Sequence, residues 1–414
     1  MRIGTALVLA LIVVTACGGD SSSDGANGSS SGDTNAANID GGPGGDGGGA
    51  SSSSSGGTTG GGGGSAAKLA TKIRGKSQFL IGMGNDLAPN HDQDGAYTLG
   101  QTLDLHYAYL VGLKGSGGWP DWNSGGTFVN ILADSADKHG TTPMYTLYAM
   151  AAWGENNMSV LENDTFMKPY FEGVRLLFER IAAFGKPAVV HLEPDFWGYA
   201  QKASPDAKHA AHVKSLVPEC AAANLSDDVG GFARCIITLG RAIAPKAVIG
   251  FHASSWAGET QTIVSFMKTI GADGADFVST DMLDRDAGCF EAHTDPACQR
   301  GGKTGWYWDE SNKTSPNFHE HLAFAKSLSS GVGLPLMWWQ VPFGVPSDTP
   351  GGTSGKYRDN RVRYLFAHVD EFVAAGGFAA AFGTGAANQT YITTDGDQFK
   401  NAVAGYYGKP VALP

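Results

Sequence analysis

The amino-acid sequence predicts a (β/α)8 TIM barrel, preceded by a signal peptide and a disordered Gly/Ser-rich tether. Eight short apolar segments alternate with amphipathic stretches of helical period, which is the pattern of a parallel sheet. Residues 68–414 carry this pattern without a break in composition, and eight units in that length fit one closed barrel. An open doubly wound sheet is the alternative, but no GxGxxG motif follows the first segment.

The N-terminus has the layout of an export signal. One arginine precedes an apolar run from Ala6 to Val14, which is short for a membrane span. The sequence VTAC at 14–17 resembles the bacterial lipobox, in which the cysteine becomes the lipid-modified first residue of the mature protein. We therefore expect a signal peptide at 1–16 and a lipid anchor on Cys17, which implies an exported protein of the bacterial cell envelope, at the outer membrane or cell surface. The alternative is a cleaved signal without lipidation.

Residues 17–67 are almost entirely Gly, Ser, Thr, Asn, Asp and Ala. They lack the apolar side chains that could offset the entropy of ordering, so we predict a flexible tether.

Residues 68–414 form the predicted barrel domain. The formal net charge is -11 and no Lys/Arg cluster stands out, which argues against nucleic acid as a partner. We expect a monomer without a cofactor.

Four cysteines of the barrel domain fall into two local pairs. An exported chain permits disulfides, and short loops are the easiest to close. We therefore predict the bonds Cys220–Cys235 and Cys289–Cys298 among the three possible pairings. Zinc binding is the alternative, but no CxxC spacing supports it.

The predicted strands follow one another along the whole barrel domain, and amphipathic helices lie between most of them. The strands are predicted at Gln78–Leu87, Leu103–Leu113, Thr142–Ala151, Ala188–Asp195, Ala247–Ser255, Asp276–Leu283, Leu334–Pro342 and Gly377–Gly383. The helices are predicted at Phe166–Phe184, Gly230–Ala244, Ile263–Ile270, Phe318–Ser329 and Arg361–Ala375. Only the first connection shows no clear helical pattern.

The fourth predicted strand carries an unusual run of polar side chains. Because side chains alternate along a strand, His191, Glu193 and Asp195 share one face. A parallel strand is normally apolar on both faces, so this face is predicted to point into the mouth of the barrel. Barrel enzymes place their chemistry at the carboxyl ends of the strands, where Glu193 stands.

The same alternation places polar groups at the ends of other strands. These are Asp86, Asp104, His106, His252, Ser254, Ser279, Asp281, Trp338 and Gln340. Buried polar groups are costly unless they are paired, so this many at equivalent ends indicate a solvent-filled functional mouth.

The nine tryptophans all lie within or after the carboxyl half of a predicted strand. Aromatic rings offer flat faces to the C–H faces of sugars, and neighbouring acids and amides can bind the hydroxyls. We predict substrate contacts for Asp86, His106, Trp119, Trp122, His191, Trp197, His252, Trp256, Trp338 and Gln340. The alternative for the rings is that they anchor the core or the loops. By alternation, Trp339 is predicted to point outward.

Glycoside hydrolysis needs two carboxyl groups flanking the scissile bond, one of which donates a proton. Glu193 is the predicted donor, because a partly apolar aromatic site raises a carboxyl pKa. The sequence LEP at 192–194 resembles the Asn-Glu-Pro of the large clan of (β/α)8 retaining glycosidases. That resemblance implies that the glutamate is the acid/base. Leu192 replaces the asparagine, and Gln340 stands where the clan carries its nucleophilic glutamate.

The sequence leaves the identity of the second carboxylate undecided among several acids. Asp281 is inward by alternation and lies across the mouth, whereas Asp195 follows Glu193 on the same strand. Asp86 and Glu155 are lesser candidates.

The many aromatic residues favour endo-action on a polysaccharide or oligosaccharide. Two alternatives are a carbohydrate-binding barrel without catalysis, favoured by Gln340, and a metal-dependent hydrolase that uses His106, His191 and His252 with acids.

Overall fold

A computed structural model of the chain describes residues 63–84, 95–282, 286–299, 306–384 and 388–414. The predicted signal peptide, Cys17 and Asp86 lie outside these residues, as does most of the predicted tether. None of the helices within them is long and apolar enough to cross a membrane.

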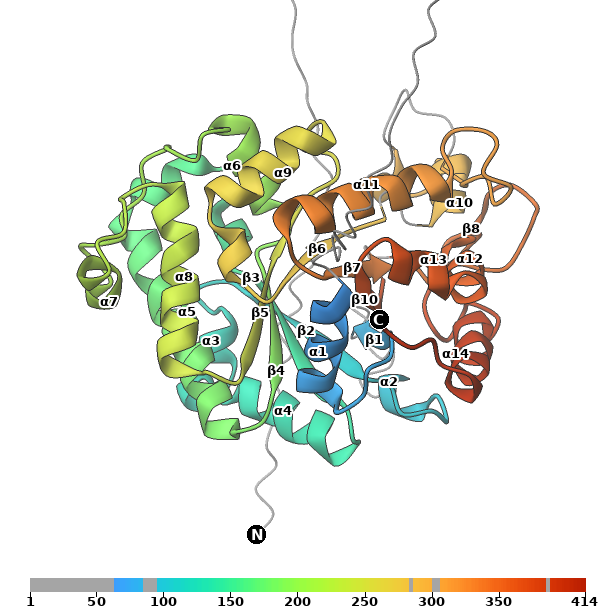
Figure 1. Cartoon of the computed structure of the whole chain (residues 1–414), viewed down its shortest axis with the longest axis horizontal. Coiled ribbons are helices and arrows are strands. Elements are labelled where there is room, and N and C mark those ends of the chain that lie inside the picture. The colour runs from blue at the N-terminus through green and yellow to red at the C-terminus, as the bar shows by residue number, and fades with distance from the viewer. Residues whose placement is uncertain (1–62, 85–94, 283–285, 300–305, 385–387) are drawn as a thin grey trace, which may run out of the picture.

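Eight parallel strands close into a barrel in the order β1-β10-β7-β6-β5-β4-β3-β2, which confirms the predicted (β/α)8 fold (Figure 1). The barrel strands are β1 (Leu80–Gly84), β2 (Leu105–Val111), β3 (Thr142–Tyr148), β4 (Ala188–Leu192), β5 (Ala247–His252), β6 (Phe277–Thr280), β7 (Leu336–Val341) and β10 (Gly377–Phe382). Each lies within a predicted strand. The predicted strands extend further, because the polar residues at their carboxyl ends belong to loops.

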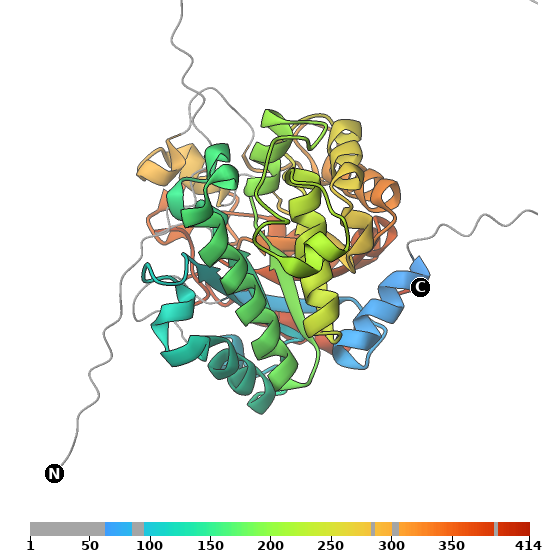
Figure 2. The same ribbon diagram turned by 90° about the vertical axis from the view of Figure 1, so that its left-hand side faces the viewer.

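Helices surround the barrel on its outer side (Figure 2). The larger ones are α4 (Phe128–Lys138), α5 (Asp164–Phe184), α8 (Val229–Ile243), α9 (Thr260–Thr269), α11 (Phe318–Val332) and α14 (Gln398–Gly408). Side-chain caps start three of them: Asn163 accepts from Thr165 N, Asp228 from Gly231 N, and Asn317 forms a capping box with Glu320.

Shorter helical segments fill the connections. They are α2 (Gly95–Thr98), α3 (Trp119–Trp122), α6 (Phe196–Ala203), α7 (Pro218–Ala222), α10 (Ala287–Ala292), α12 (Arg361–Ala367) and α13 (Val369–Ala374), with 3-10 turns η1 (Ser124–Gly126), η2 (Met150–Trp153), η3 (Met158–Glu162), η4 (Ala272–Gly274) and η5 (Pro296–Cys298). The helix predicted at Arg361–Ala375 is therefore two helices. The first connection contributes only α2 to the described residues.

Helix α1 (Gly63–Arg74) packs at the amino ends of the strands, and it begins five residues before the predicted boundary at residue 68. Its Ile73 carbonyl accepts from Thr142 Oγ1 at the start of β3, and Lys72 pairs with Asp276 just before β6. Its last residue, Arg74, lies 3.5 Å from the Asp104 carboxylate.

Asp104 lies at this amino end, and not at the mouth as predicted. It is fully buried and accepts hydrogen bonds from Ile81 N at 3.1 Å and from Tyr407 Oη at 2.7 Å. Arg74 and Lys76 balance its charge at 3.5 and 3.6 Å. One carboxylate thus joins β1, β2, α1 and α14.

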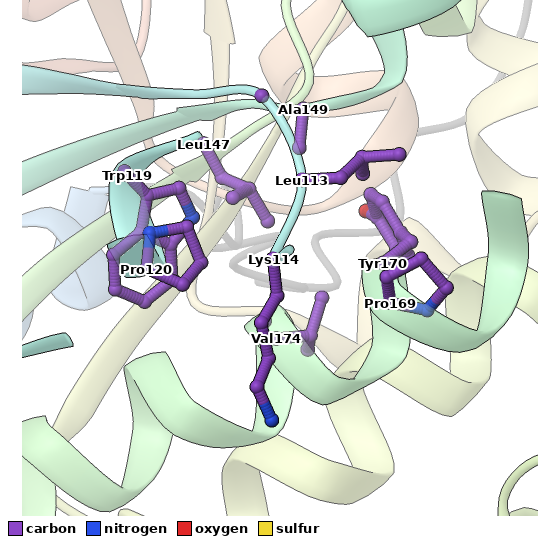
Figure 3. A pocket seen from close by; sticks show the side chains of 11 residues that line it. Leu113, Lys114, Trp119, Pro120, Leu147, Ala149, Pro169, Tyr170 and Val174 are labelled. Atoms are coloured by element: carbon purple, nitrogen blue, oxygen red, sulfur yellow. The ribbon is translucent and has the colours of Figure 1, made fainter. Parts of the chain in front are cut away.

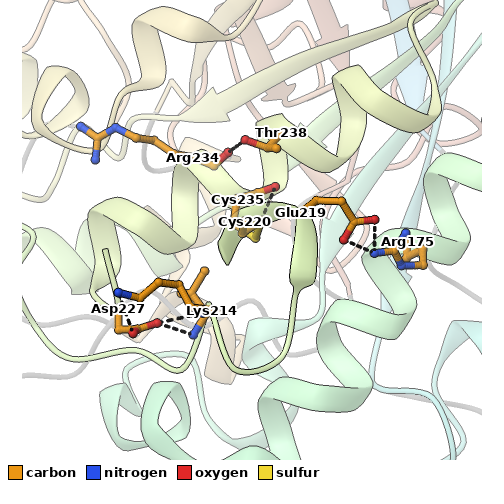
Figure 4. The surroundings of a disulfide bond; sticks show 9 residues. Arg175, Lys214, Glu219, Cys220, Asp227, Arg234, Cys235 and Thr238 are labelled. Atoms are coloured by element: carbon orange, nitrogen blue, oxygen red, sulfur yellow. Dashed lines mark hydrogen bonds and ion pairs between the residues drawn. A yellow bond between two sulfur atoms is a disulfide. The ribbon is translucent and has the colours of Figure 1, made fainter. Parts of the chain in front are cut away.

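Both predicted disulfides are present in the structure. Cys220–Cys235 ties α7 to α8 beside the Arg175–Glu219 ion pair (Figure 4). Cys289–Cys298 lies in a small second core beyond the barrel, beside a hairpin of β8 (Gly352–Thr353) and β9 (Lys356–Tyr357). That core comprises Ala287, Cys289, Phe290, Cys298, Trp306 and Tyr357.

Asp104→Ala should lower the free energy of unfolding by about 3–5 kcal/mol, because it leaves buried donors and cations without their partner. Urea unfolding followed by circular dichroism would measure the change. The matched control is Asp137→Ala, which removes a solvent-exposed pair with Lys186 at 2.7 Å and should cost about 1 kcal/mol or less. Equal losses in the two variants would contradict the proposed role of Asp104.

Candidate active site

The barrel interior is built around Trp339. Its ring lies 4.9 Å from that of His191, 5.6 Å from His252, 5.8 Å from Tyr109 and 6.3 Å from Tyr107. These contacts span strands β2, β4, β5 and β7. The prediction that Trp339 points outward is therefore wrong, and its ring forms the floor beneath the mouth.

Trp338 points outward, which corrects its predicted substrate contact. Its Nε1–H donates to His321 Nε2 on α11 at 2.9 Å, and its ring packs on Phe372 of α13 at 4.8 Å. The reason is an irregularity in the pairing of β7 with β10. Ala380 pairs with Trp338 but Phe382 pairs with Val341, so β7 carries one extra residue at this point.

Gln340 remains inward despite following Trp339 directly. Its φ of 54° is left-handed, so alternation stops at this residue. The side-chain amide donates to Tyr109 Oη and to the Thr384 carbonyl, and it is almost fully buried. A substrate contact for Gln340 stays a prediction.

His191 and His252 form a buried network in the interior. His191 Nε2 lies 3.1 Å from His252 Nδ1 and 3.0 Å from Ser279 Oγ, and Thr146 Oγ1 lies 3.4 Å from His191 Nδ1. Both histidines are fully buried. Burial and the neighbouring His252 hold the pKa of His191 well below its usual range. In this structure the pair supports the floor and is not exposed to a substrate.

Glu193 does not point into the mouth, which corrects the central prediction from the sequence. Its side chain is fully buried, and its two carboxylate oxygens accept from Ala149 N at 3.3 Å and Met150 N at 3.0 Å. Its φ is 46°, so the alternation of β4 ends at Leu192. Burial raises the pKa of Glu193 to about 8, while the Met150 N–H, the Tyr170 hydroxyl of α5 and the Ala149 N–H oppose the rise.

Two other acids meet at the mouth, on the hydroxyl of Tyr148. Tyr148 ends β3 on the same inward face as Thr146. Its hydroxyl contacts Glu155 Oε1 and lies 3.3 Å from Asp195 Oδ2. Both acids are partly exposed, whereas Tyr148 is buried. Burial raises the pKa of Glu155, although the hydrogen bond from Tyr148 opposes this.

The hydroxyl of Tyr148 stays protonated. Burial raises the pKa of its hydroxyl far above its usual range, and the charges of Asp195 and Glu155 add to this. A neutral hydroxyl can donate one hydrogen bond and accept another. The three groups can therefore hold and pass a proton at the carboxyl ends of β3 and β4.

Asp281 and Trp256 follow β6 and β5 at the same end of the barrel. Asp281 is partly exposed and accepts from Ser255 Oγ at 3.1 Å. Trp256 is partly exposed and lies 4.8 Å from the Tyr199 ring, with Lys202 Nζ 4.5 Å from its own ring centre. Tyr199 is one helical turn after Asp195 on α6, so Trp256 remains a candidate for substrate contact.

The other predicted aromatic contacts belong mainly to the packing. Trp197 is fully buried between Phe232 and Phe251, and its Nε1–H donates to the Leu192 carbonyl. Trp119 is buried against α5, where the space among its neighbours is too small for a water molecule (Figure 3). These two predictions are corrected. Trp122 is 37% exposed, and its contact with substrate stays a prediction.

His106 points outward from β2, away from the interior. Its Nδ1 lies 2.6 Å from Tyr97 Oη of α2, and the Tyr97 ring stacks on His139 after α4. Burial lowers the pKa of His106 to about 4, with a smaller contribution from His139. His106 therefore cannot join His191 and His252 around one metal ion. No other group of three or more His, Cys, Asp or Glu in the described part of the chain is arranged to hold a metal.

Sequence reasoning missed Tyr148 and gave Glu155 only a minor place. Tyr148 was within reach, because it is the next inward residue after Thr146 on the predicted third strand. Glu155 lies beyond the turn η2, where no periodic pattern fixes the direction of a side chain.

No protein-family profile and no curated protein matches the chain. Solved structures that match are distant and include glycoside hydrolases with (β/α)8 barrels. The endoglucanase Cel6 from Mycobacterium tuberculosis is 15% identical, with a TM-score of 0.32 over 60% of this chain and 66% of that one, just under two thirds of its length. A GH26 β-mannanase from Bacteroides ovatus is 10% identical, with a TM-score of 0.46 over 83% and 92%. A hyperthermophilic endo-β-1,4-glucanase is 11% identical, with a TM-score of 0.45 over 81% and 99%.

Because His191 is buried with a depressed pKa, we predict that the free energy of unfolding falls at acidic pH. Below about pH 6.5 the unfolded chain binds protons that the folded chain does not, since the pKa of His191 is depressed on folding. The free energy of unfolding should fall by up to about 1.4 kcal/mol per pH unit for this residue. Urea unfolding at several pH values between 7.5 and 5 would give the free energy of unfolding as a function of pH. This free energy should fall less steeply with decreasing pH in His191→Gln than in the wild type. An equally steep fall would contradict the depressed pKa of His191.

Proposed function

We propose that the protein is an exported glycoside hydrolase that cleaves a polysaccharide at the mouth of its barrel. The observation that carries this proposal is the meeting of Glu155 and Asp195 on the Tyr148 hydroxyl. Glycoside hydrolysis needs a carboxyl group that keeps a proton at neutral pH next to a solvent-accessible site. Glu155 and Asp195 are partly exposed to solvent, whereas Glu193 is fully buried.

In this proposal the Glu155–Tyr148–Asp195 group supplies the acid. Burial favours the protonated form of Glu155, and a carboxylate close to another raises the pKa of one of them. Tyr148 contacts both acids and can relay a proton between them. Asp195 or Glu155 then donates to the leaving oxygen of the scissile bond, which is the general-acid step.

Asp281 is the proposed second carboxylate. It follows β6, two strands round the barrel from β4, and it accepts a hydrogen bond from the Ser255 hydroxyl. A carboxylate there would attack the sugar or activate a water from the side opposite the acid. Trp256, with Tyr199 and Lys202 beside it, offers an aromatic face for a sugar ring near Asp195.

Asp195→Asn and Glu155→Gln should each lower kcat/KM on the cleaved polysaccharide by about 10²–10⁴-fold, because each breaks the proton-holding group. A reducing-sugar assay on a panel of glycans would measure this. On an aryl glycoside with a strongly acidic phenol, which needs little protonation, the loss in these variants should be much smaller. Asp281→Asn should lose activity on both kinds of substrate.

The control is Asp206→Asn, which changes an exposed acid bonded to Ser204 and should retain full activity. Binding of glycans without turnover by the wild type would instead favour the carbohydrate-binding alternative. Loss of activity with a chelator would favour the metal-dependent alternative. Full activity in both Asp195→Asn and Glu155→Gln would remove the basis of the proposal.

We also propose that Cys17 carries a lipid anchor. The lipobox-like sequence at 14–17 supports this, and the Gly/Ser-rich composition of the residues after it suits a spacer. Labelled palmitate should enter the wild-type protein in a bacterial host, and Cys17→Ala should abolish the label. Equal labelling of both would refute the anchor.

A further inference from the structure

We infer that Glu193 is a positioning residue that fixes Glu155 and Asp195 on the Tyr148 hydroxyl, an inference that rests on the proposed function. It joins the two loops that carry these acids. One loop follows β3 and contains Ala149, Met150 and Glu155. The other follows β4 and contains Glu193 and Asp195 themselves.

The contacts of Glu193 tie the loops together at their origins. The carboxylate accepts from the consecutive N–H groups of Ala149 and Met150, at 3.3 and 3.0 Å. Its own N–H donates to the Leu147 carbonyl at 2.7 Å, which extends the β3–β4 pairing beyond the strands. Tyr148 lies between Leu147 and Ala149, so Glu193 holds the backbone on both sides of the shared hydroxyl.

The backbone of this segment needs such a restraint. Glu193 and Asp195 both have left-handed φ angles, 46° and 68°, on either side of Pro194. Residues that are not glycine keep such angles only where the surroundings over-determine them. The turn places Asp195 Oδ2 3.3 Å from the Tyr148 hydroxyl, and the two backbone hydrogen bonds that Glu193 accepts help to restrain it.

A direct role of Glu193 in proton transfer conflicts with its surroundings. The side chain is fully buried, and both of its oxygens already accept backbone hydrogen bonds. The pKa of about 8 means that the group is mostly protonated at neutral pH. Glutamine keeps the length and the neutral charge of the protonated form, but its amide has only one acceptor oxygen, so it can accept from only one of the two N–H groups.

The test compares Glu193→Gln, Glu193→Asp and Glu193→Ala, with Glu172→Ala on the exposed face of α5 as the control. Two readouts are taken for each variant that is folded by circular dichroism. One is kcat/KM on the polysaccharide. The other is the titration of Glu155 by carbon-13 carboxyl NMR, assigned with Glu155→Gln, which requires no activity.

Glu193→Gln keeps the length and one acceptor oxygen, so it should lower kcat/KM by about tenfold, and the Glu155 titration should move down less than in Glu193→Asp and Glu193→Ala. Glu193→Asp retains a carboxyl group but is too short to reach both N–H groups, so kcat/KM should fall by about 100-fold. In Glu193→Asp and Glu193→Ala the Glu155 titration should move down toward the ordinary glutamate pKa, because the loop opens to solvent.

Two outcomes would overturn the inference. A loss in Glu193→Gln as large as that in Asp195→Asn would make Glu193 a catalytic acid. If Glu155 titrates in Glu193→Asp and Glu193→Ala as it does in the wild type, Glu193 does not position Glu155 and Asp195. If the wild type cleaves no glycan, the proposed function fails, while the NMR titration still decides whether Glu193 positions Glu155.

Discussion

The packing of Trp339 inside the barrel is the constraint on which the rest of the structure depends. One ring contacts residues of β2, β4 and β5 from its place on β7 and is almost fully buried among them. The polar side chains below it must satisfy one another, as His191, His252 and Ser279 do. The proposed active site therefore lies in the layer above, where Tyr148, Glu155 and Asp195 meet.

The fold could be predicted because its signals are long and repeated. Apolar runs, helical periods and the absence of a nucleotide-binding glycine motif all pointed to one closed barrel, and both disulfides join cysteines that are close in sequence. The details at the strand ends could not be predicted in the same way. Alternation holds only while the backbone is extended, and it fails at Glu193 and Gln340, where φ turns positive. The extra residue of β7 shifts the pattern again, which exchanges the directions of Trp338 and Trp339.

The aromatic residues show a second limit of the sequence. Trp119, Trp197 and Trp338 follow strand positions that also suit a binding groove, yet each is buried against a helix. A tryptophan that anchors a loop and one that faces a sugar occupy the same kind of place in a sequence. Only the neighbours distinguish them: Phe232 and Phe251 enclose Trp197, whereas Tyr199 and Lys202 leave Trp256 partly exposed.

The position of α1 has a consequence for orientation. This helix packs across the amino ends of the strands, so the chain enters the barrel on the face opposite the mouth. Any attachment made through the N-terminus would hold the molecule by its closed base. The acids and the exposed aromatic rings would then be presented to the surrounding medium, where a polymer too large to enter the envelope could reach them.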